Sequence, residues 1–286
     1  MPELPDLQYI VRTLSPRIIA RRITRVTVKE PIVIRMLLAD SGGFVEALTG
    51  RSFTALDRRG PFLRFALEDK ELIMHCMLAG RLQIAGIKDK PLPRTCFSLA
   101  LDDDSRLSYG DEKKMGKVYL TASGAYEAIP GFREQGIDIL SHEFTLEAFT
   151  RLIQDRRHQA RVFLMDQAAL SAIGNAYADE ILFAAGIHPK TSCASLSPED
   201  RQKLYDSIRQ VMEWGIAEVE KAGQPVEVKV REHVRVRNRN GQPCPVCGTT
   251  IRRVGVLGYD SFYCPRCQPA TRKQFIPWQE ERTHDA

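Results

Sequence analysis

Four cysteines near the C-terminal end of the chain constrain its folding more than any other feature. They form two C-x-x-C pairs, Cys244 with Cys247 in CPVC and Cys264 with Cys267 in CPRC, and sixteen residues separate the pairs. Each pair can offer two thiolates to one ion, so the spacing is typical of a tetrahedral zinc site. Two redox disulfides are the alternative, which a reducing cytosol disfavours. We predict one structural Zn²⁺ that supplies much of the folding energy of this segment.

Length and composition predict a multidomain protein. A chain of 286 residues with 43% hydrophobic residues is too long for one ordinary core and suits two or three domains. No stretch approaches the roughly 20 apolar residues of a membrane span. The N-terminus lacks a basic region followed by an apolar run, so no secretory signal is expected. We expect a cytoplasmic protein with no membrane partner.

The excess positive charge lies in the last fifth of the chain. Residues 225–286 contain eleven Lys and Arg against six Asp and Glu, whereas the first 224 residues contain thirty of each kind. Concentrated basic charge points to an acidic partner such as nucleic acid, although a solvated basic surface has the same composition.

Hydrophobic periodicity separates a β-rich region from a helical one. After an N-terminal helix that begins near Pro5, short β-rich segments with Gly, Asp and Lys turns indicate an antiparallel β-sandwich up to about residue 125. From about residue 143 the periodicity is helical, with helices expected at 144–156, at 160–170 and from about 173. A long fourth helix has Ser197 as its expected N-cap and Pro198 at its first position.

Residues 226–242 alternate valine with charged residues, which predicts a basic strand leading into the zinc ribbon. The expected fold is therefore α+β and multidomain. We assign residues 1–130 to the β-sandwich with its N-terminal helix, 131–224 to a helical domain, 225–270 to the basic strand and ribbon, and 271–286 to a C-terminal tail.

The stretch "SAIGNAYADEILFAAGIHP" is the most distinctive part of the helical region. Gly174 and Asn175 precede a helix, so backbone N–H groups and the positive end of the helix dipole would be available to a phosphate there. The alternative for Asn175 is an ordinary N-cap.

The N-terminus, "MPELPDLQYI", can be read as an amphipathic helix start or as a reactive site. If Met1 is removed, Pro2 carries a free secondary amine, which is a nucleophile, and Glu3 lies beside it as a possible acid.

These segments together resemble the formamidopyrimidine-DNA glycosylase and endonuclease VIII family of base-excision repair enzymes. The resemblance is carried by "PELP", by "RRG" before a hairpin strand, by "IGNAYADEILFAAGIHP" and by the CPVCG…YCPRCQ ribbon, in that order. It extends from Pro2 to Gln268 and implies that the helical domain, residues 131–224, is a helix–two-turns–helix DNA-binding domain. It also implies a partner, double-stranded DNA with damaged bases or abasic sites, bound by a monomer.

The resemblance implies a role for the opening residues. In this family the terminal proline amine attacks C1′ of the damaged nucleotide, which places Pro2 as nucleophile, and Glu3 matches the acid that protonates the sugar ring oxygen. A secondary amine bound to the sugar carbon yields an iminium ion, an electron sink that favours β-elimination of the 3′ phosphate. Asp6 stands where the family usually has glutamate.

The chain departs from the family at several DNA-facing positions. The lysine that usually follows "RRG" is Pro61 here, and the phosphate-gripping arginine of the ribbon is Tyr259. The residues that fill the void left by an extruded base become Leu78, Lys113 and Met115, of which Leu78 and Met115 could act as apolar wedges. We expect eight residues to contact DNA: Gly174, Asn175, Lys113, Arg94, Arg161, Arg235, Arg237 and Tyr259.

Two functions fit this pattern. The first is a DNA glycosylase and abasic-site lyase whose lesion preference is not standard 8-oxoguanine. The second is a DNA-damage-binding protein with the same scaffold that lacks efficient base excision. Retention of Pro2 and Glu3 favours the enzyme, since a binding protein gains nothing evident from a free proline beside an acid. A zinc-ribbon transcription factor does not account for the first 130 residues.

Overall fold

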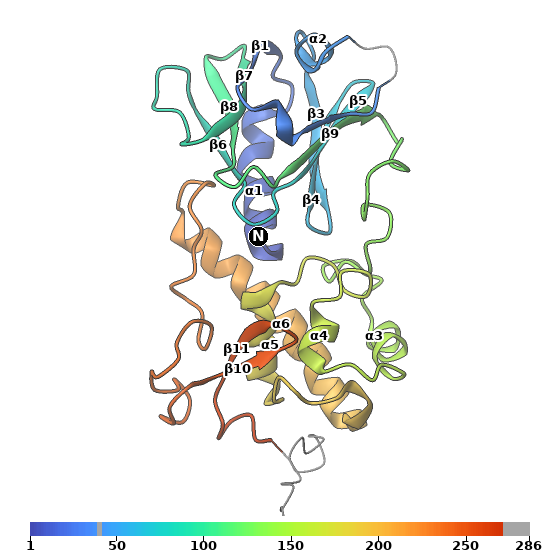
Figure 1. Cartoon of the computed structure of the whole chain (residues 1–286), viewed down its shortest axis with the longest axis vertical. Coiled ribbons are helices and arrows are strands. Elements are labelled where there is room, and N and C mark those ends of the chain that lie inside the picture. Colours follow the sequence, from blue (N-terminus) through green and yellow to red (C-terminus); the bar gives the residue numbers. More distant parts are fainter. Residues whose placement is uncertain (39–41, 271–286) are drawn as a thin grey trace, which may run out of the picture.

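The structure is a computed structural model that describes residues 1–38 and 42–270. The helices are α1 (Leu4–Ile18), α2 (Phe44–Leu48), α3 (Leu146–Ile153), α4 (Ala160–Leu164), α5 (Asn175–Ala185) and α6 (Pro198–Ala222), with 3-10 turns η1 (Pro31–Val33) and η2 (Cys193–Ser195). A β-sandwich with helices α1 and α2 forms the upper half of Figure 1, and helices α3 to α6 and the small ribbon form the lower half, with the N-terminus between the halves. None of the helices among the described residues is both long and apolar enough to cross a membrane.

Two sheets make up the sandwich. One has the order β1-β7-β8-β6 and is antiparallel throughout, and the other has the order β2-β9-β5-β4-β3. The predicted antiparallel sandwich is confirmed except at one edge, where β2 runs parallel to β9. The strands are β1 (Ile23–Val28), β2 (Ile34–Met36), β3 (Phe53–Arg59), β4 (Phe62–Leu67), β5 (Lys70–His75), β6 (Arg81–Gly86), β7 (Thr95–Leu101), β8 (Ser105–Gly110) and β9 (Lys117–Ala122).

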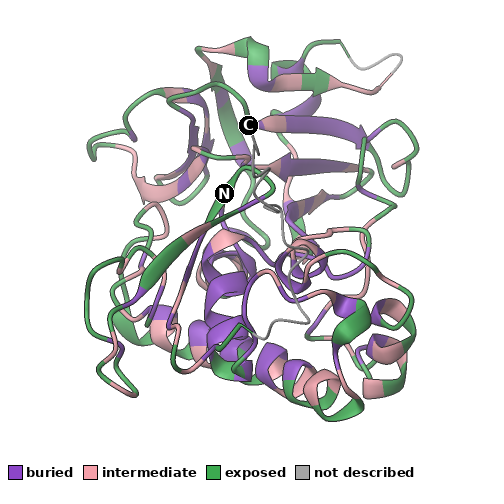
Figure 2. Ribbon diagram, turned by 60° about the horizontal axis from the view of Figure 1, so that its bottom comes forward, coloured by how far each residue is buried: buried purple, intermediate pink, exposed green. Residues whose placement is uncertain are grey.

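Helix α1 joins the two halves of the molecule. Its apolar side chains Leu7, Leu14 and Ile18 are fully buried, because the helix packs on β3 of the sandwich and on α6 of the helical half. Figure 2 shows this continuity as buried segments that run from the strands into the helices around the N-terminus. The start of α1 is therefore fixed against both halves.

The long helix α6 begins as its sequence predicts. The Ser197 hydroxyl accepts the N–H of Asp200 at 3.1 Å, Pro198 is the first helical residue, and Gly223 ends the helix with φ of +57°. The helix predicted over residues 160–170 is wrong in length, because α4 ends at Leu164. The Asp166 carboxylate accepts the N–H of Ala168 at 3.0 Å, and such a local bond competes with continuation of a helix.

The strand predicted for residues 226–242 is wrong. The structure has turns and irregular backbone there, although Val234 and Val236 are buried as an alternating pattern requires. The N–H groups of residues 235, 236 and 237 all donate to the Glu180 carboxylate of α5, at 2.9, 2.9 and 3.0 Å. A strand partner cannot use donors that a side chain already holds.

The ribbon is an antiparallel hairpin of β10 (Arg252–Val256) and β11 (Tyr259–Tyr263). Phe183 of α5 packs with Val236, Ile251 and Phe262 in a small cluster that seats the ribbon on the helical half. The predicted tail, residues 271–286, lies outside the described residues.

Candidate active site

Pro2 and Glu3 lie at the buried start of α1. The Glu3 side chain is only 3% exposed, and its two oxygens accept the N–H groups of Ala176 at 3.2 Å and Tyr177 at 3.0 Å. These are two of the free donors in the first turn of α5, so the Glu3 carboxylate uses part of the helix start that the sequence predicts for a phosphate.

Gly174 makes this contact possible. A Cβ at this position would lie 2.7 Å from both Cγ and Cδ of Glu3, closer than carbon atoms can approach. The residue before α5 is therefore required to be glycine for a steric reason: any side chain there would keep Glu3 from reaching the start of α5.

Asp6 and Arg231 tie α1 to the segment that follows α6. Arg231 donates from Nη1 to Asp6 Oδ1 at 2.8 Å, and the backbone N–H of Glu3 donates to Asp6 Oδ2 at 2.8 Å. The Arg231 guanidinium also lies 5.3 Å over the Tyr177 ring, and the Tyr177 hydroxyl is 3.0 Å from Nε2 of His233. These contacts fix the first turn of α1 against the segment that follows α6.

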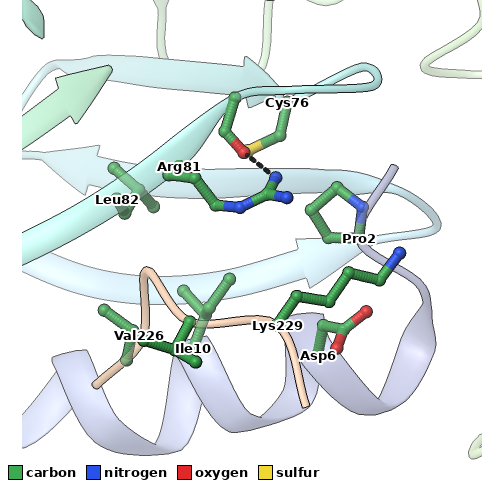
Figure 3. Close-up of a pocket in the computed structure, with 10 residues that line it drawn as sticks. Pro2, Asp6, Ile10, Cys76, Arg81, Leu82, Val226 and Lys229 are labelled. Carbon is green, nitrogen blue, oxygen red and sulfur yellow. Dashed lines mark hydrogen bonds between the residues drawn. The ribbon is translucent and has the colours of Figure 1, made fainter. Parts of the chain in front are cut away.

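A small pocket adjoins Pro2 (Figure 3). Its walls come from α1, from the β5–β6 connection and from residues 226–229. Most of the wall is apolar, including Ile10, Leu82 and Val226, and the Arg81 and Lys229 side chains extend toward Pro2 from opposite sides.

A larger groove of about 670 Å³ opens beside the same residues. It brings together six predicted site residues: Glu3, Leu78, Gly174, Asn175, Arg237 and Tyr259. Leu78 and Tyr259 are exposed, at 52% and 56%, so both present their side chains to whatever fills the groove.

Three other predicted residues, Arg94, Lys113 and Met115, are exposed but do not line this groove. Met115 is 39% exposed. Arg94 has φ of +54°.

Arg161, which the sequence predicts to contact DNA, lies buried behind Asn175. Its side chain is 1% exposed and donates to Asp179 Oδ1 at 3.2 Å and to the Asn175 side-chain oxygen at 2.7 Å. Arg161 therefore orients the Asn175 amide, whose nitrogen is left to face the groove.

The basic segment does not project a row of free arginines. Arg237 donates to Asp179 Oδ2 at 2.8 Å, and the Arg235 guanidinium lies 4.5 Å over the Trp214 ring. Sequence reasoning missed Asp179 and Glu180. The sequence signal for them was two adjacent acids in the otherwise apolar "AYADEILFAA". Acids at buried positions require hydrogen-bond or ion-pair partners, so these two could have been predicted to hold other segments.

Comparisons with known proteins cover nearly the whole chain. Three family models match: "Formamidopyrimidine-DNA glycosylase N-terminal domain" over residues 1–118, "Formamidopyrimidine-DNA glycosylase H2TH domain" over 135–225, and "Zinc finger found in FPG and IleRS" over 241–270. The formamidopyrimidine-DNA glycosylase of Symbiobacterium thermophilum is 36% identical over 276 residues, which are 94% of this chain and 90% of that protein. That of Moorella thermoacetica is 36% identical over 89% of this chain and 94% of its own length.

The chain belongs to the formamidopyrimidine-DNA glycosylase family. Solved structures of the family agree with the fold. The MutM (Fpg) protein of Thermus thermophilus superposes with a TM-score of 0.80 at 29% identity, covering 93% of this chain and 98% of that one. The Lactococcus lactis Fpg in complex with abasic-site DNA superposes with a TM-score of 0.82 at 25% identity, covering 94% of this chain and all of that one. Membership gives the enzyme class, a DNA glycosylase with abasic-site lyase activity.

The glycosylase holds one structural zinc ion in its ribbon. All four Sγ atoms lie within 4.8 Å of one another, with Cys244–Cys267 at 3.8 Å and Cys247–Cys264 at 3.4 Å. Four thiolates about 2.3 Å from a tetrahedral ion lie about 3.8 Å apart, so the donor set fits zinc and leaves no open position.

Two departures from the family pattern have clear structural settings. Pro61 is buried at the tip of the β3–β4 hairpin beside Gly60, which has φ of +53°. Tyr259 begins β11 at the edge of the groove.

Proposed function

We propose that this glycosylase acts on damaged or abasic duplex DNA through the secondary amine of Pro2, with Glu3 as the acid that opens the sugar ring. The observation that carries the proposal is that α5 holds the Glu3 carboxyl directly beside Pro2, with Pro2 lining the small pocket and Glu3 lining the larger groove. The reaction requires removal of Met1, which frees the amine.

The chemistry balances with these two residues. The amine lone pair forms a bond to C1′ while the base departs with the electrons of the glycosidic bond. The nitrogen gives up its proton, which the departing base takes. The C1′–O4′ bond then breaks as Glu3 delivers a proton to that ring oxygen, and the nitrogen lone pair forms the C=N bond of an iminium ion. Loss of a proton from C2′ then expels the 3′ phosphate.

Relatives support the DNA substrate. Solved Lactococcus lactis structures contain abasic-site DNA and DNA with an oxidised pyrimidine. For this chain we infer a monomer that binds double-stranded DNA in the cytoplasm, at the nucleoid. Asn175 and Tyr259 would face the phosphate backbone from the groove, and Leu78 would enter the void left by the extruded base, with Met115 and Lys113 beside it.

We further infer that 8-oxoguanine opposite cytosine is a poor substrate. Pro61 offers no ammonium, and the nearby arginines that could replace one are already engaged. Arg58 is held by Asp138 at 2.9 Å, and Arg59 donates to the carbonyls of residues 132 and 133 at 2.8 and 3.1 Å. Arg64 pairs with Asp57 and Glu71.

Borohydride trapping tests the nucleophile. The protein freed of Met1 should become covalently attached to abasic-site DNA, because borohydride reduces an iminium ion to a stable amine. Pro2→Gly, or retention of Met1, should reduce trapping at neutral pH at least tenfold. Undiminished trapping by chains that retain Met1 would move the nucleophile to a lysine and refute the proposal.

Single-turnover cleavage tests the lesion preference. We expect excision of 8-oxoguanine to be about one to two decades slower than cleavage at an abasic site, the equivalent of one missing charge-assisted contact in the transition state. The second elimination should also be inefficient, so end-labelled products should retain the sugar remnant.

Rapid 8-oxoguanine excision that leaves phosphate at both ends of the gap would overturn this inference. Binding without cleavage of either substrate would favour a damage-binding protein.

A further inference from the structure

Lys229 approaches the place where the reacting carbon must lie. Its Nζ is 3.4 Å from the carbonyl oxygen of Met1. The carbonyl carbon of Met1 is bonded to the Pro2 nitrogen, as C1′ would be in the covalent intermediate, so it stands in for that sugar carbon. Standard amide dimensions then place Nζ within about 6 Å of the Pro2 nitrogen.

The charges around Pro2 are unevenly compensated. The carboxylates that face it are both engaged, Glu3 with the α5 N–H groups and Asp6 with Arg231. The cations Lys229 and Arg81 have no carboxylate within ion-pair distance among the described residues, and Arg81 donates only to the Gly80 carbonyl at 2.8 Å. His75, the last residue of β5, and Cys76 after it are further titratable groups near the terminus.

We propose that Lys229 is a positioning residue for catalysis that keeps the Pro2 amine unprotonated, and therefore nucleophilic, at neutral pH. The inference rests on the proposed role of Pro2. A like charge within about 6 Å disfavours protonation of an amine, and only the unprotonated amine has the lone pair that attacks C1′.

The electrostatics of the terminus agree with this geometry. With Met1 in place, burial lowers the pKa of the terminal amine, and the Lys229 ammonium is the next cause in the same direction. Glu3 and Asp6 oppose it, and Arg81 assists it. The pKa of Lys229 is itself lowered by burial and then by Arg231.

The test is the pH dependence of borohydride trapping, measured in single turnover with saturating enzyme on abasic-site duplex DNA. The Lys229→Met variant should trap with a midpoint about one pH unit higher than the wild type. Its plateau at high pH should match the wild type. Lys229→Arg retains the charge and should keep the original midpoint. Lys221→Met, at the exposed end of α6, is the matched control and should leave the profile unchanged.

The other outcomes are distinguishable. A lower plateau with an unmoved midpoint in Lys229→Met would overturn the inference and leave Pro2 as nucleophile. Loss of trapping by Lys229→Met at every pH, with Pro2→Gly still active, would make Lys229 the nucleophile and refute both proposals.

Discussion

At the scale of single residues, the candidate site depends on close contacts that leave no space for a larger side chain. Gly174 is the clearest case, because its missing side chain is the space that Glu3 occupies. Asn175 is similarly constrained, since Arg161 holds its side-chain oxygen and so decides which way the amide points.

We therefore expect Gly174→Ala to slow single-turnover cleavage of abasic-site DNA by about 100-fold, because a displacement of Glu3 by about 1 Å misplaces the acid. Gly255→Ala is the matched control: nothing lies within 4 Å of its added Cβ, and its rate should equal the wild type. Melting temperatures of both variants would separate a lost fold from a misplaced acid. A full rate in folded Gly174→Ala would show that Glu3 does not need the α5 contact.

At the scale of elements, α5 organises the helical half of the molecule. Its first turn holds Glu3, and its buried acids hold the two segments that follow α6. Asp179 accepts the Ser261 hydroxyl at 2.6 Å and the Phe262 N–H at 3.2 Å in β11. Glu180 holds three successive N–H groups of the basic segment. The zinc ribbon and the active-site acid are thus positioned by one helix.

The ribbon should nevertheless depend on its metal. Purified protein should contain one zinc per chain, and Cys264→Ser should lose it and weaken binding to abasic-site DNA about tenfold or more, as expected for loss of one charge-assisted or stacking contact from the groove edge. The sandwich should remain folded by circular dichroism. Cys193→Ala, a buried cysteine outside the cluster, should retain both zinc and affinity. Unchanged affinity in metal-free protein would contradict this view.

At the scale of the whole molecule, two histidines, the buried His188 and the partly buried His75, link stability to pH. Burial lowers the pKa of His75, which contacts Phe62, and of His188, which contacts Tyr263, to about 4. In the unfolded chain both titrate near 6.5. Below that pH the unfolded state binds protons that the native state does not, so the free energy of unfolding falls as the pH drops from 6.5 toward 4.

Urea unfolding at pH 7 and pH 5 should reveal a loss of about 2 kcal/mol, after discounting for partial solvent screening. Burial raises the pKa of Glu180, which acts in the opposite sense, so a variant is needed to isolate the histidines. His75→Asn keeps an acceptor for the Met77 N–H that His75 Nδ1 accepts at 3.0 Å, and it should reduce the pH dependence by about half. An unaltered dependence in this variant would assign the effect to other groups.

Local patterns in the sequence were sufficient for the zinc cysteines, the start of α6 at Ser197 and the sandwich with its N-terminal helix, because spacing, capping and alternation act between near neighbours. The contacts of the segment between α6 and the ribbon were decided only by tertiary structure. Its N–H groups bind Glu180, 55 residues earlier in the chain, and Arg237 binds Asp179 rather than projecting to solvent. The placement of Lys229 beside Pro2 is equally non-local, since 228 residues separate it from the Met1 carbonyl that it contacts. The sequence shows which side chains are polar, but tertiary packing decides which groups they bind. Acids that become buried must accept hydrogen bonds from the donors that packing brings close to them.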